Sequence, residues 1–228
     1  MLVLIGVIGF EPTTSASRTR RRHGALRLTT SRDELLAGPD VTVVYAATEH
    51  HRHFDDVLAA AEAGKHVLCD KPLANTVADC RRMIDACNAH DVSLQIAYYR
   101  RYYPKMIRTR ELFASEDTGE PVTVHIHCTQ RLEPARITAD NWRLRREVSG
   151  GGALVDTGSH RLDLRCWLLG EPQVAAALAE RQELPVEATD VESLLIGMAN
   201  CVHVTSVHGY RSSSEDRFDI VGMGGSFR

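Results

Sequence analysis

The chain has 228 residues, of which 43% are hydrophobic and 25% charged, a mixture that excludes disordered, collagen-like and coiled-coil proteins. Lysine and arginine number 27 against 30 aspartate and glutamate residues, and the resulting charge of −3 argues against nucleic acid or an anionic membrane as partner. The longest apolar run, residues 1–10, is shorter than the roughly 18 residues of a membrane span, and basic residues follow it, so neither a transmembrane helix nor an export signal is expected.

Six cysteines are scattered among apolar residues and form no C-x-x-C pair. This pattern predicts reduced, buried thiols and a cytoplasmic location. The cysteines are Cys69, Cys80, Cys87, Cys128, Cys166 and Cys201.

The first half of the chain alternates short apolar runs with helical patterns. Continuous apolar runs at 41–47, 65–69 and 92–97 predict buried parallel strands, and the segments between them, about 53–63 and 76–90, predict crossover helices. In the second helix we expect Asn75 to be the N-cap and one face to be apolar. That face carries Val77, Cys80, Met83, Ile84 and Cys87. The repeat predicts three neighbouring strands in a doubly wound parallel sheet.

After about residue 98 strands follow one another with few helices. A helix at 103–113 precedes a strand at 121–128, and a glycine loop at 150–152 precedes a helix that ends near Leu169. Further strands are predicted at 173–180, 191–198, 202–210 and 218–221, which favours a mainly antiparallel open sheet in a second α+β domain. We therefore predict domains at 1–98 and 99–228. The turn-rich segment 222–228 predicts no further strand, and we expect part of the second domain to be missing.

The N-terminal strand, Leu4 to Gly9, is typical of one that leads into a phosphate-binding loop. A dinucleotide fingerprint continues as G-x-G-x-x-G, whereas here Gly6 and Gly9 are followed by Phe10, Glu11 and Pro12. Pro12 lacks an amide donor, and no acidic residue ends a second strand before Leu28. Residues 10–30 resemble a flexible tail or aberrant stretch, and their sequence predicts weak binding of NAD or NADP.

Lys71 directly follows a predicted strand, in Asp70-Lys71-Pro72. It would emerge at the carboxyl end of the parallel sheet, where ligands of such sheets bind. A partly desolvated lysine can act as a general acid or base, and Pro72 would fix the turn that aims it. A solvated loop lysine is the alternative interpretation.

Asp156 and His160 are four residues apart at the start of a helix, so they share a face. A carboxylate and an imidazole on one face make a plausible acid–base pair. The alternative is structural: Asp156 would be an N-terminal cap and His160 a helix residue paired with Asp163.

Two further clusters have competing interpretations. His50, His51 and His53 could supply two zinc ligands, but no cysteine or carboxylate stands at matching spacing, which favours His53 as a helix-start residue near a nucleotide. The basic run 18–23 could contact a 2′-phosphate or nucleic acid, although such runs are more often solvated. We expect no metal site.

An ordered set of motifs resembles the Gfo/Idh/MocA family of NAD(P)-dependent sugar and polyol oxidoreductases, over about residues 38–225. The set runs through Ala47-Thr48 with His53, residues 63–67 (AGKHV), Asp70-Lys71-Pro72-Leu73, residues 101–104 (RYYP), Asn141-Trp142-Arg143, and residues 150–160 (GGGALVDTGSH) with Asp163. The resemblance implies a Rossmann domain for the cofactor and an α/β domain that holds the sugar and forms a homo-oligomer through its sheet.

The resemblance also implies roles for single residues. Lys71 matches the lysine of an E-K-P motif, and Asp156 and His160 match a D-x-x-x-H helix. His160 would be the base, Lys71 would polarise the substrate oxygen, and Asp156 would orient the substrate and hold the imidazole tautomer. These three are expected to converge on one cleft. Arg101, Trp142 and Arg143 would line the sugar pocket, and the residues toward the cofactor would be Gly6, Gly9, Thr48, His53, Asp70 and Lys71.

Two departures from the family pattern keep a second hypothesis open. Asp70 replaces the glutamate of E-K-P and keeps its charge, whereas the glycine loop and the ribose-binding carboxylate are unmatched. The first hypothesis is hydride transfer between NAD(P) and a sugar or cyclic polyol, inositol included. The second is a non-catalytic sugar-binding or regulatory relative, or an inactive fragment.

Overall fold

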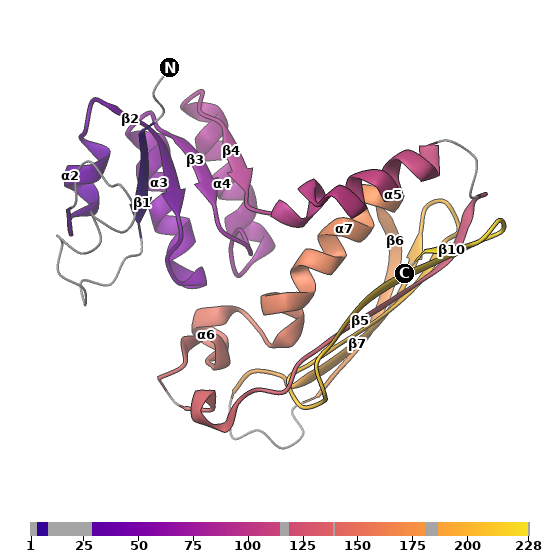
Figure 1. Ribbon diagram of the computed structural model, residues 1–228. Helices are drawn as coiled ribbons and strands as arrows, with labels where there is room; N and C mark the ends of the chain where they lie inside the picture. The colour runs from indigo at the N-terminus through magenta and orange to yellow at the C-terminus, as the bar shows by residue number, and fades with distance from the viewer. Residues whose placement is uncertain (1–3, 9–28, 115–118, 139, 181–186, 228) are drawn as a thin grey trace. The chain divides into compact units, whose positions relative to one another are not determined.

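The chain divides into two compact units, residues 1–97 and 98–228 (Figure 1). The computed structural model describes residues 4–8, 29–114, 119–138, 140–180 and 187–227. None of the helices in these ranges has the length and apolar character needed to cross a membrane.

The first unit contains a four-stranded parallel sheet whose strands are β1 (Leu4–Ile8), β2 (Val41–Ala46), β3 (His66–Cys69) and β4 (Leu94–Ile96). They lie side by side in chain order, as Figure 1 shows. Val44 pairs with Val67 and Cys69 with Ile96, all in parallel. The predicted parallel arrangement of the three runs is therefore confirmed, because each apolar run is joined to the next by a helical crossover.

Three helices accompany this sheet: α2 (Arg32–Leu36), α3 (His53–Glu62) and α4 (Val77–Ala89). Val57 and Ala61 of α3 and Met83 and Cys87 of α4 pack with the strands in one buried core. The buried alanines Ala60 and Ala61 have small side chains, which lets α3 pack close to the sheet.

Two details predicted for α4 are wrong. Thr76, not Asn75, is the N-cap: its hydroxyl accepts a hydrogen bond from the Asp79 amide at 3.0 Å. Val77 is 69% exposed and Ile84 46% exposed, so the apolar face is narrower than the sequence pattern indicates. Met83 and Cys87, one turn apart, are buried in the core, and half-buried Cys80 packs beside them.

The second unit contains a six-stranded mixed sheet in the order β10-β9-β5-β8-β7-β6. Its strands are β5 (Pro121–Thr129), β6 (Pro172–Glu180), β7 (Val191–Met198), β8 (His203–Gly209), β9 (Glu215–Gly222) and β10 (Ser226–Phe227). Only β5 and β8 pair in parallel, so the predicted mainly antiparallel open sheet is confirmed. The expectation of no further strand is wrong, because β10 turns back and pairs with β9 through Ser226 and Val221.

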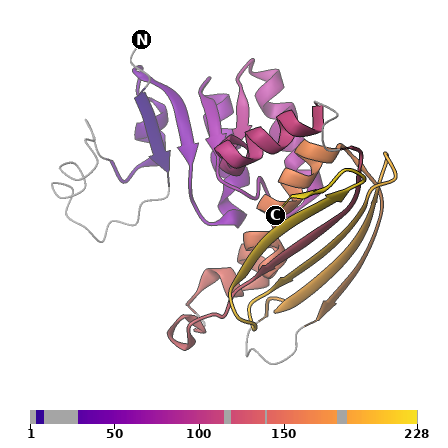
Figure 2. The same cartoon turned by 45° about the vertical axis from the view of Figure 1, so that its right-hand side comes forward.

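Helices cover one face of this sheet (Figure 2). These helices are α5 (Pro104–Ala114) and α7 (Ser159–Leu169). The second unit also contains α6 (Arg146–Ser149) and short 3-10 helices at Tyr99–Tyr102, Pro134–Arg136 and Trp142–Leu144. Leu169 and Leu162 of α7 pack on Val124, Val204 and Ile220 of the strands. On other sheet positions Val174, Leu178 and Leu195 are 67%, 63% and 55% exposed, which leaves an apolar surface on β6 and β7.

The predicted burial of the cysteines is only partly correct. Cys69, Cys87 and Cys128 are buried, whereas Cys80 and Cys166 are half-buried and Cys201 is exposed. Cys201 follows β7 in a tight turn with φ of 62°, a place where the chain reverses at the surface.

Candidate active site

In the first unit the candidate residues lie where β2 and β3 end. The Asp70 amide donates to Ala46 O at 2.8 Å, which extends the pairing of the two strands by one step. Asp70 Oδ1 accepts from the Lys71 amide at 2.8 Å, and the Lys71–Pro72 peptide bond is cis. Lys71 is thus held in a defined turn at the carboxyl edge of the sheet, as the sequence predicts.

His53 joins the loops after these two strands. Its side chain is fully buried, with Nδ1 2.8 Å from Pro72 O and Nε2 3.1 Å from Thr48 O. A neutral imidazole can donate one of these hydrogen bonds and an imidazolium can donate both. His53 therefore fixes the distance between the Thr48 loop and the turn that carries Lys71.

Thr48 is held from a second side by α3. Its hydroxyl donates to Asp56 Oδ2 at 2.8 Å, and the other carboxylate oxygen of Asp56 accepts from Arg32 at 3.3 Å. Asp56 is 1% exposed, so both partners offset the cost of burying its charge.

The other candidates of the first unit fall largely outside the described residues. Gly6 lies within β1, while Gly9, the segment 10–28 and the basic run 18–23 are not described. Within the described ranges no three ligating side chains gather as a metal site would require, and both ring nitrogens of His53 face backbone carbonyls.

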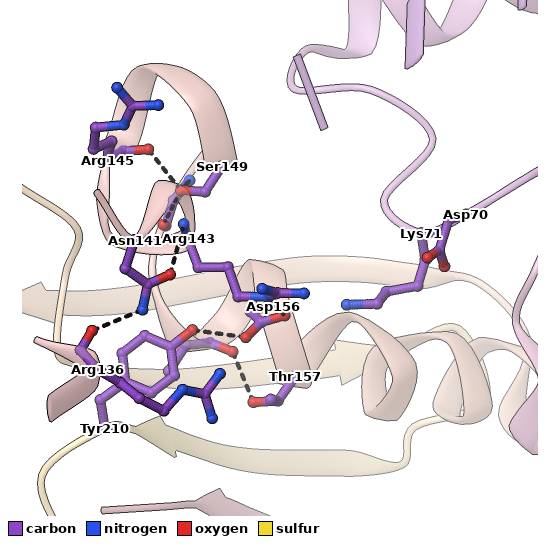
Figure 3. Close-up of polar contacts among 12 residues, drawn as sticks. Asp70, Lys71, Arg136, Asn141, Arg143, Arg145, Ser149, Asp156, Thr157 and Tyr210 are labelled. Carbon is purple, nitrogen blue, oxygen red and sulfur yellow. Dashed lines mark hydrogen bonds and ion pairs between the residues drawn. The ribbon is translucent and has the colours of Figure 1, made fainter. Parts of the chain in front are cut away.

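In the second unit Asp156 lies on a wide π-helical turn, Leu154–Gly158, that leads into α7. Tyr210 donates from its hydroxyl to Asp156 Oδ2 at 3.1 Å, as Figure 3 shows. Arg143 approaches the other oxygen, with Nε 3.9 Å from Oδ1. Asp156 is therefore not an N-cap. The N-cap of the turn is Ala153, and the carboxylate of Asp156 contacts residues from distant segments of the chain.

Tyr210 is a reliable donor to this carboxylate. Its side chain is 2% exposed, and burial, followed by the charge of Asp156, raises the pKa of Tyr210 above its usual value. The phenol accordingly stays protonated at neutral pH and donates its proton to Asp156.

His160 lies one helical turn after Asp156 and is 5% exposed. The rings of Tyr98 and Tyr99 meet it edge-on, with centroids 5.9 and 5.0 Å away. Such edge contacts restrict the orientation of the imidazole plane.

Asp163, the proposed partner of His160 in the structural alternative, pairs with Arg101. Arg101 Nε donates to Asp163 Oδ2 at 2.7 Å, and Arg101 Nη2 donates to Oδ1. The hydrogen bond with Asp163 raises the pKa of Arg101. This bidentate ion pair connects the 3-10 helix Tyr99–Tyr102 to α7. Arg101 therefore fixes the position of the 3-10 helix in addition to carrying a positive charge.

The predicted pocket residues Trp142 and Arg143 are neighbours in space as well as in sequence. The guanidinium of Arg143 lies over the Trp142 ring at 4.5 Å from its centroid. Asn141 caps the short 3-10 helix Trp142–Leu144 by accepting a hydrogen bond from the Arg143 amide at 3.3 Å, and its side-chain amide donates to Arg136 O at 2.8 Å (Figure 3). The structure thus brings Arg143 and Asp156 together, with Trp142 beside them.

The π-helical turn is anchored to β7 by Glu192. Glu192 Oε2 accepts from the Leu154 amide at 3.3 Å, and Oε1 accepts from the Thr189 hydroxyl. A side chain at Gly152 would overlap Thr189 O and Glu192, so only glycine allows this close approach. The triple glycine that the sequence shows therefore brings the backbone against the sheet.

Sequence reasoning missed Tyr98, Tyr99, Tyr210 and Glu192. Their contacts to Asp156, His160 and Leu154 span up to 62 positions, so no local spacing reveals them. Lys71 belongs to the first compact unit, and Asp156 and His160 belong to the second.

Two family models match nearly the whole chain. Residues 4–98 match an oxidoreductase family with an NAD-binding Rossmann fold, and residues 106–228 match the GFO/IDH/MocA C-terminal domain.

Individual relatives agree. The chain is 34% identical over 182 residues to 1,5-anhydro-D-fructose reductase of Ensifer adhaerens, an alignment that covers 78% of this chain and 54% of the relative. It is 36% identical over 132 residues to a D-xylose 1-dehydrogenase [NADP(+)] of Haloarcula marismortui, covering 58% of this chain and 37% of the relative. It also superposes on levoglucosan dehydrogenase, solved in complex with NADH and levoglucosan, with a TM-score of 0.86 at 26% identity, covering 97% of this chain and 62% of the other.

The alignments thus span between 37% and 54% of the length of these two curated relatives. Three observations agree with one another: the match of both family models, the parallel sheet whose strand β3 is followed by Asp70-Lys71-Pro72, and the π-helical turn and helix that carry Asp156 and His160. The chain belongs to the Gfo/Idh/MocA family of oxidoreductases.

Proposed function

We propose that this protein is an oxidoreductase that transfers a hydride between NAD(P) and a hydroxyl-bearing carbon of a sugar or cyclic polyol. The observation that carries the proposal is the ordered pair on the π-helical turn and α7. Asp156 is held by Tyr210, and His160 is held by two tyrosine rings one turn later. Polar groups held in such a defined orientation, one partly buried and one buried, are typical of catalytic sites.

The chemistry requires a proton acceptor. When a hydride leaves a carbinol carbon, the hydroxyl proton must leave as well, and an imidazole is the side chain best suited to accept it near neutral pH. We assign this role to His160. Lys71 donates a hydrogen bond to the same substrate oxygen and stabilises the negative charge that develops there.

Asp156 has the role of orienting the substrate and supporting the tautomer of His160. A carboxylate accepts hydrogen bonds from sugar hydroxyls, and the bond from Tyr210 keeps one of its oxygens in place. Arg143, with Trp142 beneath its guanidinium, and Arg101 are assigned to the pocket wall. A sugar presents both C–H groups and hydroxyl groups, and an apolar ring beside fixed hydrogen-bond donors and acceptors can contact both.

The described residues fit the nicotinamide cofactor that the family binds. The carboxyl ends of β2 and β3 present the Thr48 hydroxyl and the Lys71 ammonium on loops that His53 holds rigid. Together with Gly6, Gly9 and Asp70, these residues are the ones we assign to cofactor binding. A bound NAD(P)+ supplies the hydride acceptor.

Substitution of the assigned residues tests the proposal. With sugars and cyclic polyols as substrates and NAD+ or NADP+ at several millimolar, His160→Asn and Lys71→Met should lower kcat by about 10²- to 10⁴-fold. Lys105→Met, an exposed lysine of α5, is the control and should retain full activity. Equal activity of His160→Asn and the unaltered chain would refute the assignment.

One observation favours a second candidate, a non-catalytic sugar-binding relative. After β1 the sequence places Phe10, Glu11 and Pro12 where the family pattern has a glycine loop. Calorimetry with sugars in the absence of cofactor separates the two proposals. Sugar binding without any turnover at millimolar NAD(P) would support the second.

We further infer a second copy of the chain as partner on the sheet of the second unit, and a cytoplasmic location. The exposed side chains of Val174, Leu178 and Leu195 supply an apolar surface of the kind that subunit interfaces cover. Sedimentation should give an oligomer, and Leu178→Asp should shift it to a monomer. A monomer for the unaltered chain would contradict this inference.

A further inference from the structure

A histidine that the proposed chemistry does not use lies directly beneath the segment that carries Asp156 and His160. His208, on β8, is fully buried. A Cβ atom placed on Gly158 would lie 2.6 Å from His208 Nδ1 and 2.8 Å from its Cε1, closer than real side-chain contacts allow. The imidazole therefore fits into the space that the missing side chain of Gly158 leaves.

The His208 ring is itself firmly held. Its Nε2 lies 2.6 Å from Ser206 Oγ, and Ser206 is 1% exposed. Among the described residues no hydrogen-bond partner reaches Nδ1, the atom that faces Gly158. Burial, and then the charges of Arg161 and His127, lower the pKa of His208 to about 4, so the ring is neutral at physiological pH. A neutral ring with one fixed nitrogen acts as a rigid spacer.

The position of Gly158 makes this spacer important for the site. Gly158 ends the π-helical turn, two residues after Asp156 and two before His160. Tyr210, which donates to Asp156, comes two residues after His208. Two residues at the end of β8 and just beyond it therefore contact the π-helical turn: Tyr210 contacts the carboxylate of Asp156, and His208 contacts the backbone at Gly158.

We propose that His208 is a positioning residue for the proposed reaction: its ring, received by Gly158, sets the distance between the sheet and the helical segment that carries Asp156 and His160. This inference rests on the proposed function. A displacement of about 1 Å in a catalytic group can lower the rate about 100-fold, so a spacer at this point controls the rate without touching substrate.

Adding a methyl group at position 158 and then removing the His208 ring tests the inference. Gly158→Ala places a methyl group against the ring and should lower kcat by about 100-fold, with a much smaller change in KM for the sugar. Adding His208→Ser removes the ring that the methyl group meets, and this double variant should recover at least about tenfold of the loss. His203→Ser is the matched control, since His203 is exposed on the same strand, and it should behave as the unaltered chain.

A readout without turnover keeps the inference separate from the proposed function. The imidazole resonances of His160, assigned with His160→Asn, should shift in Gly158→Ala and return in the double variant. Absence of sugar turnover in the unaltered chain would refute the function, whereas this measurement would still report on His208.

If Gly158→Ala does not fold, His208→Ser alone decides the matter, because it removes bulk without adding a clash. It should move the His160 resonances while circular dichroism stays native. Unchanged His160 resonances in a folded Gly158→Ala or His208→Ser, or a double variant no better than Gly158→Ala, would overturn the inference.

Discussion

The hydroxyl of Tyr210 supplies a fixed hydrogen bond to Asp156, and its removal isolates one atom of the site. Tyr210→Phe keeps the ring and deletes a bond to a charged acceptor, worth about 1.5–3 kcal/mol. We expect kcat/KM for the sugar to fall about 10- to 100-fold while the fold is kept. Steady-state kinetics measure this, and Tyr102→Phe, on a side chain that is 72% exposed, is the control.

His53 holds two loops at the carboxyl edge of the parallel sheet. His53→Ala would leave Pro72 O and Thr48 O without the ring that now lies 2.8 and 3.1 Å away. Because the site is buried, we expect the free energy of unfolding to fall by about 2–4 kcal/mol. Urea denaturation measures the loss. His51→Ala, at a half-exposed side chain nearby, should cost well under 1 kcal/mol, and an equal loss in both variants would contradict the role of His53.

His208 makes stability depend on pH in a defined direction. Its pKa of about 4 in the folded chain lies below the usual 6.5, so the unfolded chain binds more protons between these values. The contribution to stability is complete above pH 6.5 and is lost as the pH falls toward 4, by up to about 3 kcal/mol. Urea denaturation at pH 7 and pH 5 should show a larger loss for the unaltered chain than for His208→Gln. Identical pH dependence in both would rule this out.

At the scale of elements, the start of α4 gives a direct test of a local assignment. Thr76 accepts from the Asp79 amide at 3.0 Å and donates to Asp79 Oδ2 at 2.7 Å. Thr76→Ala should therefore destabilise the protein by about 1 kcal/mol, while Thr76→Ser, which keeps the hydroxyl, should cost little. Thermal unfolding compares the two variants, and equal midpoints would show that the cap contributes nothing.

Most elements could be predicted because their signals are local. Buried parallel strands such as β2 are continuous apolar runs, and helices such as α3 follow helical spacing. The N-cap of α4 was misplaced because Asn75 and Thr76 are adjacent and both can cap. β10 was missed because a two-residue strand among glycines carries no periodic signal and forms only through its pairing with β9.

The motifs of the candidate site could be predicted from the sequence, whereas the residues that hold those motifs in place could not. Asp156 and His160 are recognisable by their spacing after three glycines, and Lys71 by its place after a strand. The π-helical turn, Tyr210 and the close contact of Gly158 with His208 depend on residues that only tertiary packing brings together. These contacts join residues that are far apart in the sequence, and local spacing carries no information about them.

At the scale of the whole molecule, the cofactor affinity depends on the sequence after β1. After Gly9 the sequence does not continue as G-x-G-x-x-G, and no acidic residue ends a second strand before Leu28, so the pattern that holds pyrophosphate and ribose in this fold is incomplete. Losing several charge-assisted hydrogen bonds, each worth about 1.5–3 kcal/mol, would move a micromolar site beyond millimolar. Calorimetric titration of residues 1–228 with NAD and NADP should therefore give dissociation constants above about 1 mM. A micromolar value would contradict this prediction and point to another phosphate-binding segment.

Hydride transfer itself can be followed even when cofactor binding is weak. Incubation of the protein with millimolar reduced cofactor deuterated at nicotinamide C4, together with oxidised sugars, places the label in the sugar only if the hydride moves. Mass spectrometry of the sugars is the most direct test of the proposed function. We expect deuterium in a sugar product with the unaltered chain and at least about 100-fold less with His160→Asn. No deuterium with the unaltered chain, or equal labelling by both, would contradict it.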